Sequence, residues 1–411
     1  LPPNGLEIEL TAKPDTVAVL PGTPTQVYRY EGRVIQGDPA ALQVIPDSYV
    51  GPIVRAHKGQ WVRVHLHNQL PVESNIHWHG LIVPANMDGH PHDLAAPGGE
   101  FVYDFEIRNQ AGTYWFHPHK HGDTGAQVNK GLAALFIVSD DEEQQLGLPS
   151  GSQDVALVIQ DRRIDADNQF VYLTGAMAGM GTPATGATGM NGQAMNGQAM
   201  GGMGGGMMGG GMMDSMMGFL GDHILVNGKP NAVLPLATRA YRMRVLNGSN
   251  ARIYKLAWSD GRPMTVLGTD SGLLAQPDQR PYVSLAPGER IELWADFGDT
   301  PVGTEVKLQS LEFSGGMDMM GGMGRMGGMG MGGMMGGMIP NGAAFDVMTV
   351  RVDRQEQDDA VLPKTLVTVP AADASQAVNA NQPRPFVLAM APGMMWTING
   401  HIYEMNKVGP D

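Results

Sequence analysis

Two short histidine pairs are the residues of this chain best suited to chemistry. They are His77 and His79, separated by a tryptophan, and His117 and His119, separated by a proline. Side chains two residues apart on a β-strand point to the same face, so each pair would present two imidazoles side by side. Imidazole is a favoured ligand of copper, zinc and iron. The pairs therefore predict one metal centre, provided that their strands are neighbours in a sheet or sandwich.

The other histidines give weaker signals. All but two of the 12 histidines lie between residues 57 and 121. His65 and His67 form a further same-face pair, which we interpret as an exposed polar strand face. His90 and His92 lie in a Gly/Pro loop, where they are either loop surface or weak metal ligands. We interpret His121 as a surface residue or a supporting residue beside the second pair.

The elements that must position these residues read as strands. Short alternating or β-branched runs, separated by Gly, Pro and Asn, fill residues 1–140 without a long helical stretch, which predicts an all-β sandwich. A polar break at 140–146 precedes a second set of such runs, so we expect a second sandwich at 147–352. Residues 353–385 are polar and rich in Ala and Pro, as in a linker, and 386–411 would begin a third sandwich.

Two low-complexity segments interrupt the second of these regions. Residues 177–217 and 317–338 hold 12 and 10 of the chain's 30 methionines, mostly among glycines. Thioether sulfur is a soft ligand that selects Cu(I), so we expect the segments to collect copper. Asp214 and Asp318 lie inside them and could add an oxygen ligand. The alternative is a plain low-complexity insertion with adaptable apolar side chains.

Composition excludes several classes of partner. The formal net charge is -14 over 411 residues, which argues against nucleic acid or an anionic membrane. The longest apolar runs, such as residues 131–138, are far too short to span a bilayer. The chain begins with Leu1, and we expect it to be a mature or trimmed product whose targeting segment has been removed.

Around the histidine pairs the chain resembles the multicopper oxidases. This family includes laccases, ascorbate oxidase and bacterial cuprous oxidases, and the resemblance rests on Asn75-Ile76-His77-Trp78-His79-Gly80 and on Gly112 to His119. It extends over essentially the whole chain, and further matching stretches lie at 51–52, 61–64, 88–89, 97–98, 130–133, 226–228, 244–247, 250–252 and 270–274. The closest pattern is that of periplasmic cuprous oxidases of copper resistance, which also carry Met-rich insertions.

The resemblance implies a fold and a role for each site residue. The fold would be two cupredoxin-like Greek-key sandwiches and the start of a third. His77 would bind the type 2 copper of a trinuclear cluster, and His79, His117 and His119 would bind the type 3 pair. Asp88 matches an acidic residue that assists proton delivery to oxygen, which is consistent with the four protons that reduction of O₂ to water consumes.

The resemblance also implies an activity and shows a departure from it. The activity would be one-electron oxidation of Cu(I) or phenolic donors coupled to reduction of O₂ to water, in the periplasm or outside the cell. The chain has no cysteine, whereas the family's type 1 copper has a Cys ligand in a third domain, together with four more cluster histidines. We therefore expect a piece of a longer oxidase that lacks the type 1 site by itself. The alternatives are a non-enzymatic copper-sequestering protein and, more weakly, a nitrite reductase-like protein.

Overall fold

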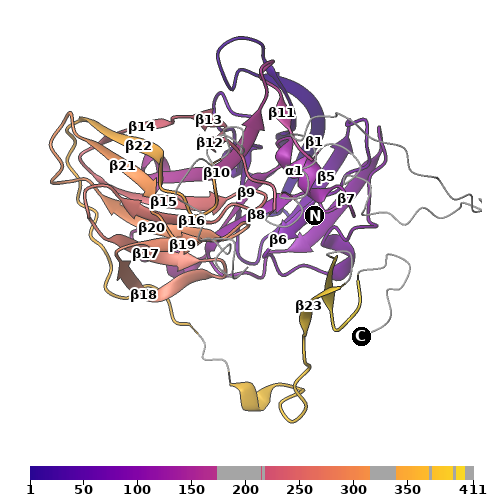
Figure 1. Cartoon of the computed structure of the whole chain (residues 1–411). Helices are drawn as coiled ribbons and strands as arrows, with labels where there is room; N and C mark the ends of the chain where they lie inside the picture. Colours follow the sequence, from indigo (N-terminus) through magenta and orange to yellow (C-terminus); the bar gives the residue numbers. More distant parts are fainter. Residues whose placement is uncertain (174–213, 215–217, 315–338, 370–372, 392–394, 403–411) are drawn as a thin grey trace, which may run out of the picture. The chain divides into compact units, whose positions relative to one another are not determined.

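Nearly all of the secondary structure in the described part of the chain is β-strand (Figure 1). The computed structural model describes every residue except 174–213, 215–217, 315–338, 370–372, 392–394 and 403–411. Two compact units are present, Leu1–Leu366 and Val367–Asp411. The prediction of an all-β protein built from cupredoxin-like sandwiches is confirmed. No helix among the described residues has the length and apolar character needed to cross a membrane.

The first sandwich consists of two sheets. One has the strand order β2-β1-β5-β7 and the other β3-β4-β9-β8-β6. The strands are β1 (Leu6–Val17), β2 (Thr25–Gln36), β3 (Leu42–Gln43), β4 (Ile53–His57), β5 (Trp61–Asn68), β6 (His77–His79), β7 (Glu100–Glu106), β8 (Gly112–His117) and β9 (Ala134–Ser139). The short helices α1 (Thr124–Asn129) and α2 (Asp141–Gln144) precede and follow β9.

The second sandwich has the sheet orders β13-β12-β10-β15-β20-β17-β18, with β11 paired to β10, and β14-β22-β21-β16-β19. Its strands are β10 (Asp154–Ile164), β11 (Phe170–Val171), β12 (His223–Val226), β13 (Lys229–Pro230), β14 (Val233–Ala237), β15 (Ala240–Asn247), β16 (Tyr254–Trp258), β17 (Met264–Thr269), β18 (Gly272–Arg280), β19 (Val283–Leu285), β20 (Arg290–Asp296), β21 (Glu305–Ser310) and β22 (Phe345–Arg354).

The two sandwiches repeat one pattern of strand pairing. In the first, β1 pairs in parallel with β5, and β4 pairs in parallel with β9. In the second, β10 pairs in parallel with β15, and β14 pairs in parallel with β22. The neighbours of these parallel pairs are antiparallel in both sandwiches. Each of the four sheets therefore contains one parallel strand pair.

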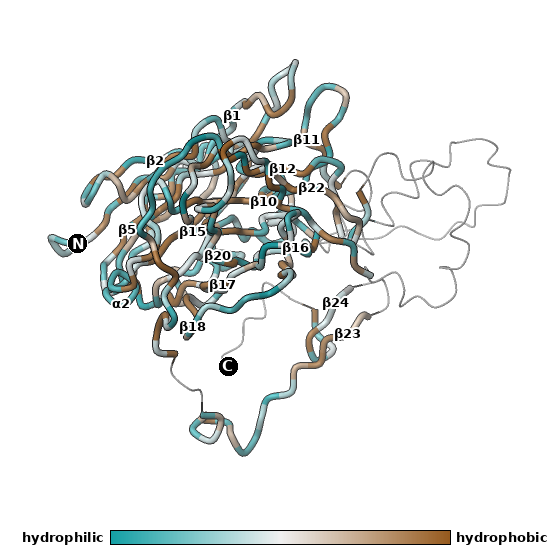
Figure 2. Tube along the Cα trace, turned by 90° about the vertical axis from the view of Figure 1, so that its left-hand side faces the viewer, coloured by the Kyte–Doolittle hydropathy of each residue, from teal (hydrophilic) through white to brown (hydrophobic). Residues whose placement is uncertain are grey.

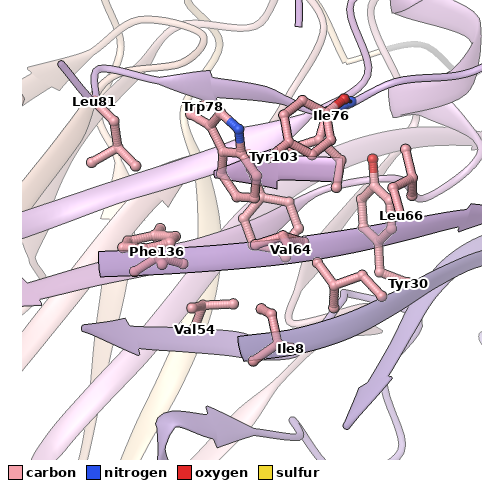
Figure 3. Packing of buried hydrophobic residues seen from close by; sticks show 14 of the residues in the cluster. Ile8, Tyr30, Val54, Val64, Leu66, Ile76, Trp78, Leu81, Tyr103 and Phe136 are labelled. Atoms are coloured by element: carbon pink, nitrogen blue, oxygen red, sulfur yellow. Dashed lines mark hydrogen bonds between the residues drawn. The ribbon is translucent and has the colours of Figure 1, made fainter. Parts of the chain in front are cut away.

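A hydrophobic core fills the space between the two sheets of each sandwich. Hydrophobic and hydrophilic stretches alternate along much of the trace (Figure 2), as expected for strands with one buried face. In the first sandwich, Ile8, Val64 and Phe136 are fully buried and pack with Trp78 and Tyr103 (Figure 3). Trp78 makes edge contacts to the rings of Tyr103 and Phe136, with centroids 5.3 and 5.9 Å apart. The tryptophan between the two histidines of β6 is thus a core residue.

The sandwiches pack against each other through a third apolar cluster. It joins Trp115, Leu135 and Ile137 of the first sandwich to Val158 and Leu246 of the second. Every residue of β8 and of β15 is buried, because the outer face of each strand is covered by the other sandwich. Two-sided burial explains why β9 reads as a nearly continuous apolar run.

Residues 140–146, expected to be a polar linker, carry buried charges in the structure. Asp140 caps α2 by accepting from the backbone N–H of Glu143, and its other carboxylate oxygen accepts from Ala111 N at 2.9 Å. Glu143 pairs with Arg242 of β15. The segment therefore fixes α2 to both sandwiches instead of running through solvent.

The second unit contains an antiparallel hairpin of β23 (Leu388–Ala391) and β24 (Met395–Ile398). Asn399 closes it, because its side-chain oxygen accepts from Val387 N and its amide donates to Pro385 O, at 2.8 and 3.0 Å. Large apolar side chains such as Leu388 and Trp396 are exposed on this hairpin.

Candidate metal centre

Adjacent strands bring the two histidine pairs together. β6 and β8 are antiparallel neighbours, and His77 lies directly opposite His117 in their register. His79 lies opposite Trp115. His119 follows β8 by two residues. We call His77, His79, His117 and His119 the four-histidine centre.

The residues between the histidines explain the direction in which the imidazoles point. Trp78 and Phe116 lie opposite each other and are completely buried in the core of the first sandwich. Because successive side chains of a strand alternate between faces, burying Trp78 and Phe116 sends His77, His79 and His117 to the other face. The apolar core therefore sets the orientation of the polar site.

The four imidazoles converge. The ring centroid of His77 lies 5.7 Å from that of His79, 5.4 Å from that of His117 and 5.1 Å from that of His119. His117 is 5.4 Å from His79 and 6.1 Å from His119. One ring nitrogen from each of His77, His79 and His117 lies within 4.8 Å of the others. This spacing suits metal ions that bind imidazole nitrogen at about 2 Å.

Hydrogen bonds fix which nitrogen two of the rings offer. His77 Nδ1 lies 2.8 Å from the backbone oxygen of Asp88, and 3.2 Å from its carboxylate. His117 Nδ1 lies 2.8 Å from the backbone oxygen of Pro118. A carbonyl oxygen only accepts, so Nδ1 carries the proton in both rings and Nε2 keeps its lone pair. Metal-binding histidines are commonly held in this way.

The other two rings lie beside those of His77 and His117. His79 Nδ1 lies 3.1 Å from His117 Nε2. The indole of Trp115 packs on both rings, with centroids 5.0 Å from His79 and 4.2 Å from His117. His119 Nδ1 is buried and has no hydrogen-bond partner among the described residues. A buried imidazole nitrogen without a partner fits a ring that binds a ligand.

Burial favours the neutral form of three of these rings. Burial, and then the charge of Arg290, lowers the pKa of His79 to about 4. Burial also lowers the pKa of His117 well below its usual value, and lowers that of His119. At His77 burial acts in the same direction, but hydrogen bonds to Asp88 outweigh it and raise the pKa. Neutral imidazole is the form that binds a metal, so the donor set fits copper.

Asn75 joins the two histidine motifs, a role that the sequence analysis did not assign. Its side chain is completely buried. Its amide donates to the backbone oxygens of Gly89 and His90, both at 2.9 Å, and its oxygen accepts from His119 N at 2.7 Å. The sequence offered one signal for this role, the spacing of two residues that Asn75, His77 and His79 share.

We expect Asn75→Ala to weaken the site and the fold together. Removing the amide leaves one buried carbonyl, one partly buried carbonyl and one partly buried N–H without partners, at a cost of about 2–4 kcal/mol in unfolding free energy. Copper affinity should fall about 10- to 100-fold, as for other groups that orient metal ligands. Denaturant unfolding and a copper competition titration measure the two effects. Unchanged copper affinity in a destabilised variant would contradict the positioning role.

Several residues singled out in the sequence lie outside this centre. The imidazole of His65 on β5 lies 2.8 Å from the carboxylates of both Glu7 and Glu100. His90 and His92 are exposed, and their rings stack on each other in the loop after Asp88, with centroids 5.8 Å apart.

The methionine-rich segments fall almost entirely outside the described residues, as does Asp318. Asp214 is described and is buried. Its carboxylate accepts two hydrogen bonds from Arg163. It is therefore already paired with a cation.

Comparisons with known proteins agree with this geometry. The multicopper oxidase family model matches residues 27–143. The "Cell division protein FtsP" of Shigella dysenteriae serotype 1 is 28% identical over 377 residues, which are 90% of this chain and 67% of that protein. The protein of the same name in Sodalis glossinidius is 33% identical over 284 residues, 69% of this chain and 51% of that protein. The chain thus spans about half to two thirds of these relatives.

Among solved structures, the McoA multicopper oxidase of the hyperthermophile Aquifex aeolicus is similar over 97% of this chain and 72% of its own. The TM-score is 0.71 and the sequence identity is 30%. The two β-sandwiches and this similarity place the chain in the class of proteins with a cupredoxin-like fold. Within that class, the chain belongs to the multicopper oxidase family.

Proposed function

We propose that the protein is a copper-dependent oxidase that couples one-electron oxidation of Cu(I) or of phenolic donors to reduction of O₂ to water. The observation that carries this proposal is the convergence of four imidazoles from β6, β8 and the segment that follows β8, three of them within 4.8 Å through one nitrogen each. A purely structural polar cluster would be expected to satisfy its nitrogens internally, whereas His119 Nδ1 has no partner among the described residues.

The four histidines would hold copper, and bound copper would exchange single electrons with O₂. His77 and His117 would offer Nε2, since their Nδ1 atoms donate to carbonyl oxygens. His79 would offer Nδ1, which faces His117 Nε2 and would release its proton when the metal binds. By family pattern, His77 would serve the type 2 copper and the other three the type 3 pair.

Asp88 would connect this site to solvent protons. Its carboxylate lies 3.2 Å from His77 Nδ1, and about a third of its side chain is exposed. It can therefore hold a proton beside the site and exchange it with water, which is what a reaction consuming four protons requires of a nearby acid.

Electrons would reach the site through a type 1 copper, which this sequence alone cannot bind through a cysteine. These 411 residues include no cysteine, so a type 1 copper thiolate would have to be supplied by another part of the protein or by a partner. Cu(I) collected by the methionine-rich segments is the proposed reductant, because thioethers favour Cu(I). A periplasmic or secreted location would fit this chemistry.

A second candidate is a copper-binding protein without turnover. The relatives named cell division proteins keep this alternative open, since their names describe no oxidase. It would use the same four histidines and the same methionine-rich segments. Copper content alone does not separate the two candidates, whereas oxygen consumption does.

The test compares matched histidine pairs. We expect the double variant His77→Gln, His79→Gln to lose the copper retained by the wild-type chain after dialysis. The control is the double variant His65→Gln, His67→Gln, which removes a same-face pair from β5 of the same sandwich. Equal copper content in both variants would contradict a copper site at the four-histidine centre.

Turnover is measured as O₂ uptake with Cu(I) or a phenol in a form of the protein that includes a type 1 copper. Asp88→Asn should keep its copper and slow O₂ uptake by about 10²-fold or more, the usual contribution of an acid–base group. Full copper content without O₂ uptake in the unmodified protein would favour the binding protein over the oxidase.

A further inference from the structure

A tight turn of the second sandwich reaches the ring of His79. The turn connects β19 to β20 at residues 286–289, and Gly288 lies at its tip with φ +81°. A Cβ built on Gly288 would lie 3.2 Å from His79 Cε1, 3.7 Å from His79 Nε2 and 3.5 Å from Trp115 Cζ2. A side chain at position 288 would therefore crowd the imidazole, which glycine avoids.

This contact sets one side of the His79 ring. Gly288 lies at the edge that carries Cε1 and Nε2, while Nδ1 faces His117 Nε2 at 3.1 Å. Trp115 covers a face of the ring, tilted by 30° with centroids 5.0 Å apart. The imidazole is thus bounded by the turn, the indole and the neighbouring imidazole.

The turn itself is fixed to the body of the second sandwich. Gly288 N donates to Asn247 O at 2.8 Å, and Asn247 N donates to Glu289 O at 3.0 Å. The carboxylate of Glu289 accepts from Ala286 N at 2.6 Å. Two hydrogen bonds thus join the turn to Asn247 and a third closes the turn on itself, which limits its movement away from His79.

Arg290 connects the turn to the histidine strands. Its guanidinium is buried and donates to Gly288 O at 2.9 Å, to Thr113 O of β8 at 3.1 Å and to Asp270 O at 2.8 Å. A Cβ on Gly80, the residue after His79, would lie 2.7 Å from Arg290 Nη2. One side chain of the second sandwich therefore contacts the residue after His79 and the strand that carries His117.

We propose that Gly288 and Arg290 form a clamp by which the second sandwich holds the His79 imidazole with Nδ1 toward His117. We call these two residues the His79 clamp. They are positioning residues, since they act on the site through His79. The consequence for copper rests on the proposed function, whereas the orientation of the ring does not.

The test adds one methyl group against the ring. Gly288→Ala places a Cβ 3.2 Å from His79, whereas the control Gly261→Ala meets open space at nearly the same backbone angle, φ +80°. Both variants strain a turn of the same sandwich, so the difference between them reports the contact with His79. Arg290→Lys keeps the positive charge and removes the planar fork that bonds to several oxygens.

The first readout needs no copper. In metal-free protein labelled with ¹⁵N-histidine, NMR reports which ring nitrogen of His79 carries the proton, with His79→Gln identifying the signal. The wild-type and Gly261→Ala proteins should show a protonated, hydrogen-bonded Nδ1. Gly288→Ala should shift that signal, and Arg290→Lys should shift it in the same direction by less. Identical His79 signals in Gly288→Ala and Gly261→Ala would overturn the clamp.

The second readout is Cu(II) affinity by competition with a chromophoric chelator. Gly288→Ala should bind Cu(II) at least about tenfold more weakly than Gly261→Ala, as expected when a ligand loses its support. Equal affinities would show that the clamp does not act on copper. If wild-type protein binds no copper at the histidines, the proposed function fails, and the NMR comparison still decides whether the clamp exists.

Discussion

Replacing His117 with glutamine is expected to lower the copper affinity of the four-histidine centre by more than about 100-fold. Changes to groups that only orient a ligand already cost about 10- to 100-fold, and His117 would be a ligand itself. It is the most buried of the four rings, 6% exposed, and it contacts all three others. Glutamine can bond to the Pro118 oxygen but offers no imidazole lone pair.

Stability in the presence of copper provides the measurement. Copper at 100 times its wild-type dissociation constant should raise the unfolding free energy of wild-type protein by about 2.7 kcal/mol, and that of His117→Gln by less than about 0.5 kcal/mol. His65→Gln on β5 is the control, and it should respond to copper as wild type does. A copper response in His117→Gln equal to that of wild type would remove this ring from the proposed ligand set.

Local strand periodicity was sufficient to predict the core of the site. The His-x-His spacing indicates a shared face, and the structure places His77 and His117 opposite each other on β6 and β8. The intervening Trp78 and Phe116 are buried, which is the packing that forces the alternation. Such information is contained within a few residues, so sequence reasoning can reach it.

Contacts between the sandwiches were not predictable in this way. Gly288 and Arg290 lie about 200 residues from His79, and no local pattern marks them as neighbours of the site. Arg242 and Arg244 alternate with apolar residues in β15, a pattern that places arginine in solvent. In the structure both are buried, because the first sandwich and α2 cover that face.

Several strands of the second sandwich also lacked a sequence signal. β18 is polar over most of its second half, contains Pro277 and is mostly exposed beyond its first residues. β21 contributes only Val306 and Leu308 as fully apolar inward residues. Their pairing with β17 and with β16 and β22 decides their conformation, and tertiary pairing of this kind outweighs local propensity.

The prediction with the largest effect on stability concerns the buried ion pairs of Glu292, which lie where the second sandwich meets the first. Glu292 accepts from Arg242 at 2.6 and 2.8 Å, from Arg244 at 2.8 Å and from the hydroxyl of Thr113 at 2.7 Å. Thr113 belongs to the first sandwich and the other three residues to the second. Only 1% of the Glu292 side chain is exposed.

Glu292→Gln is expected to lower the unfolding free energy at pH 7 by about 3–5 kcal/mol. The substitution removes a buried carboxylate that two buried arginines share, while Arg242 keeps Glu143 and Arg244 keeps Asp154 as partners. Breaking a buried pair by removing one partner costs about this much. The control is Glu305→Gln, which removes an exposed carboxylate paired with Arg351 in the same sandwich. Exposed pairs contribute little, so this control should stay close to wild type.

The loss should also depend on pH with a definite sign. Burial acts to raise the pKa of Glu292, but the charges of Arg242 and Arg244 outweigh it and lower the pKa to about 2, from a usual value of 4.5. Because the folded-state pKa is depressed, this carboxylate stabilises the protein fully above about pH 4.5, and the contribution disappears as pH falls toward 2. The gap between wild type and Glu292→Gln in denaturant unfolding should therefore narrow across that range. A gap that stays constant from pH 7 to pH 2.5 would mean that the ionised carboxylate is not the source of the stability.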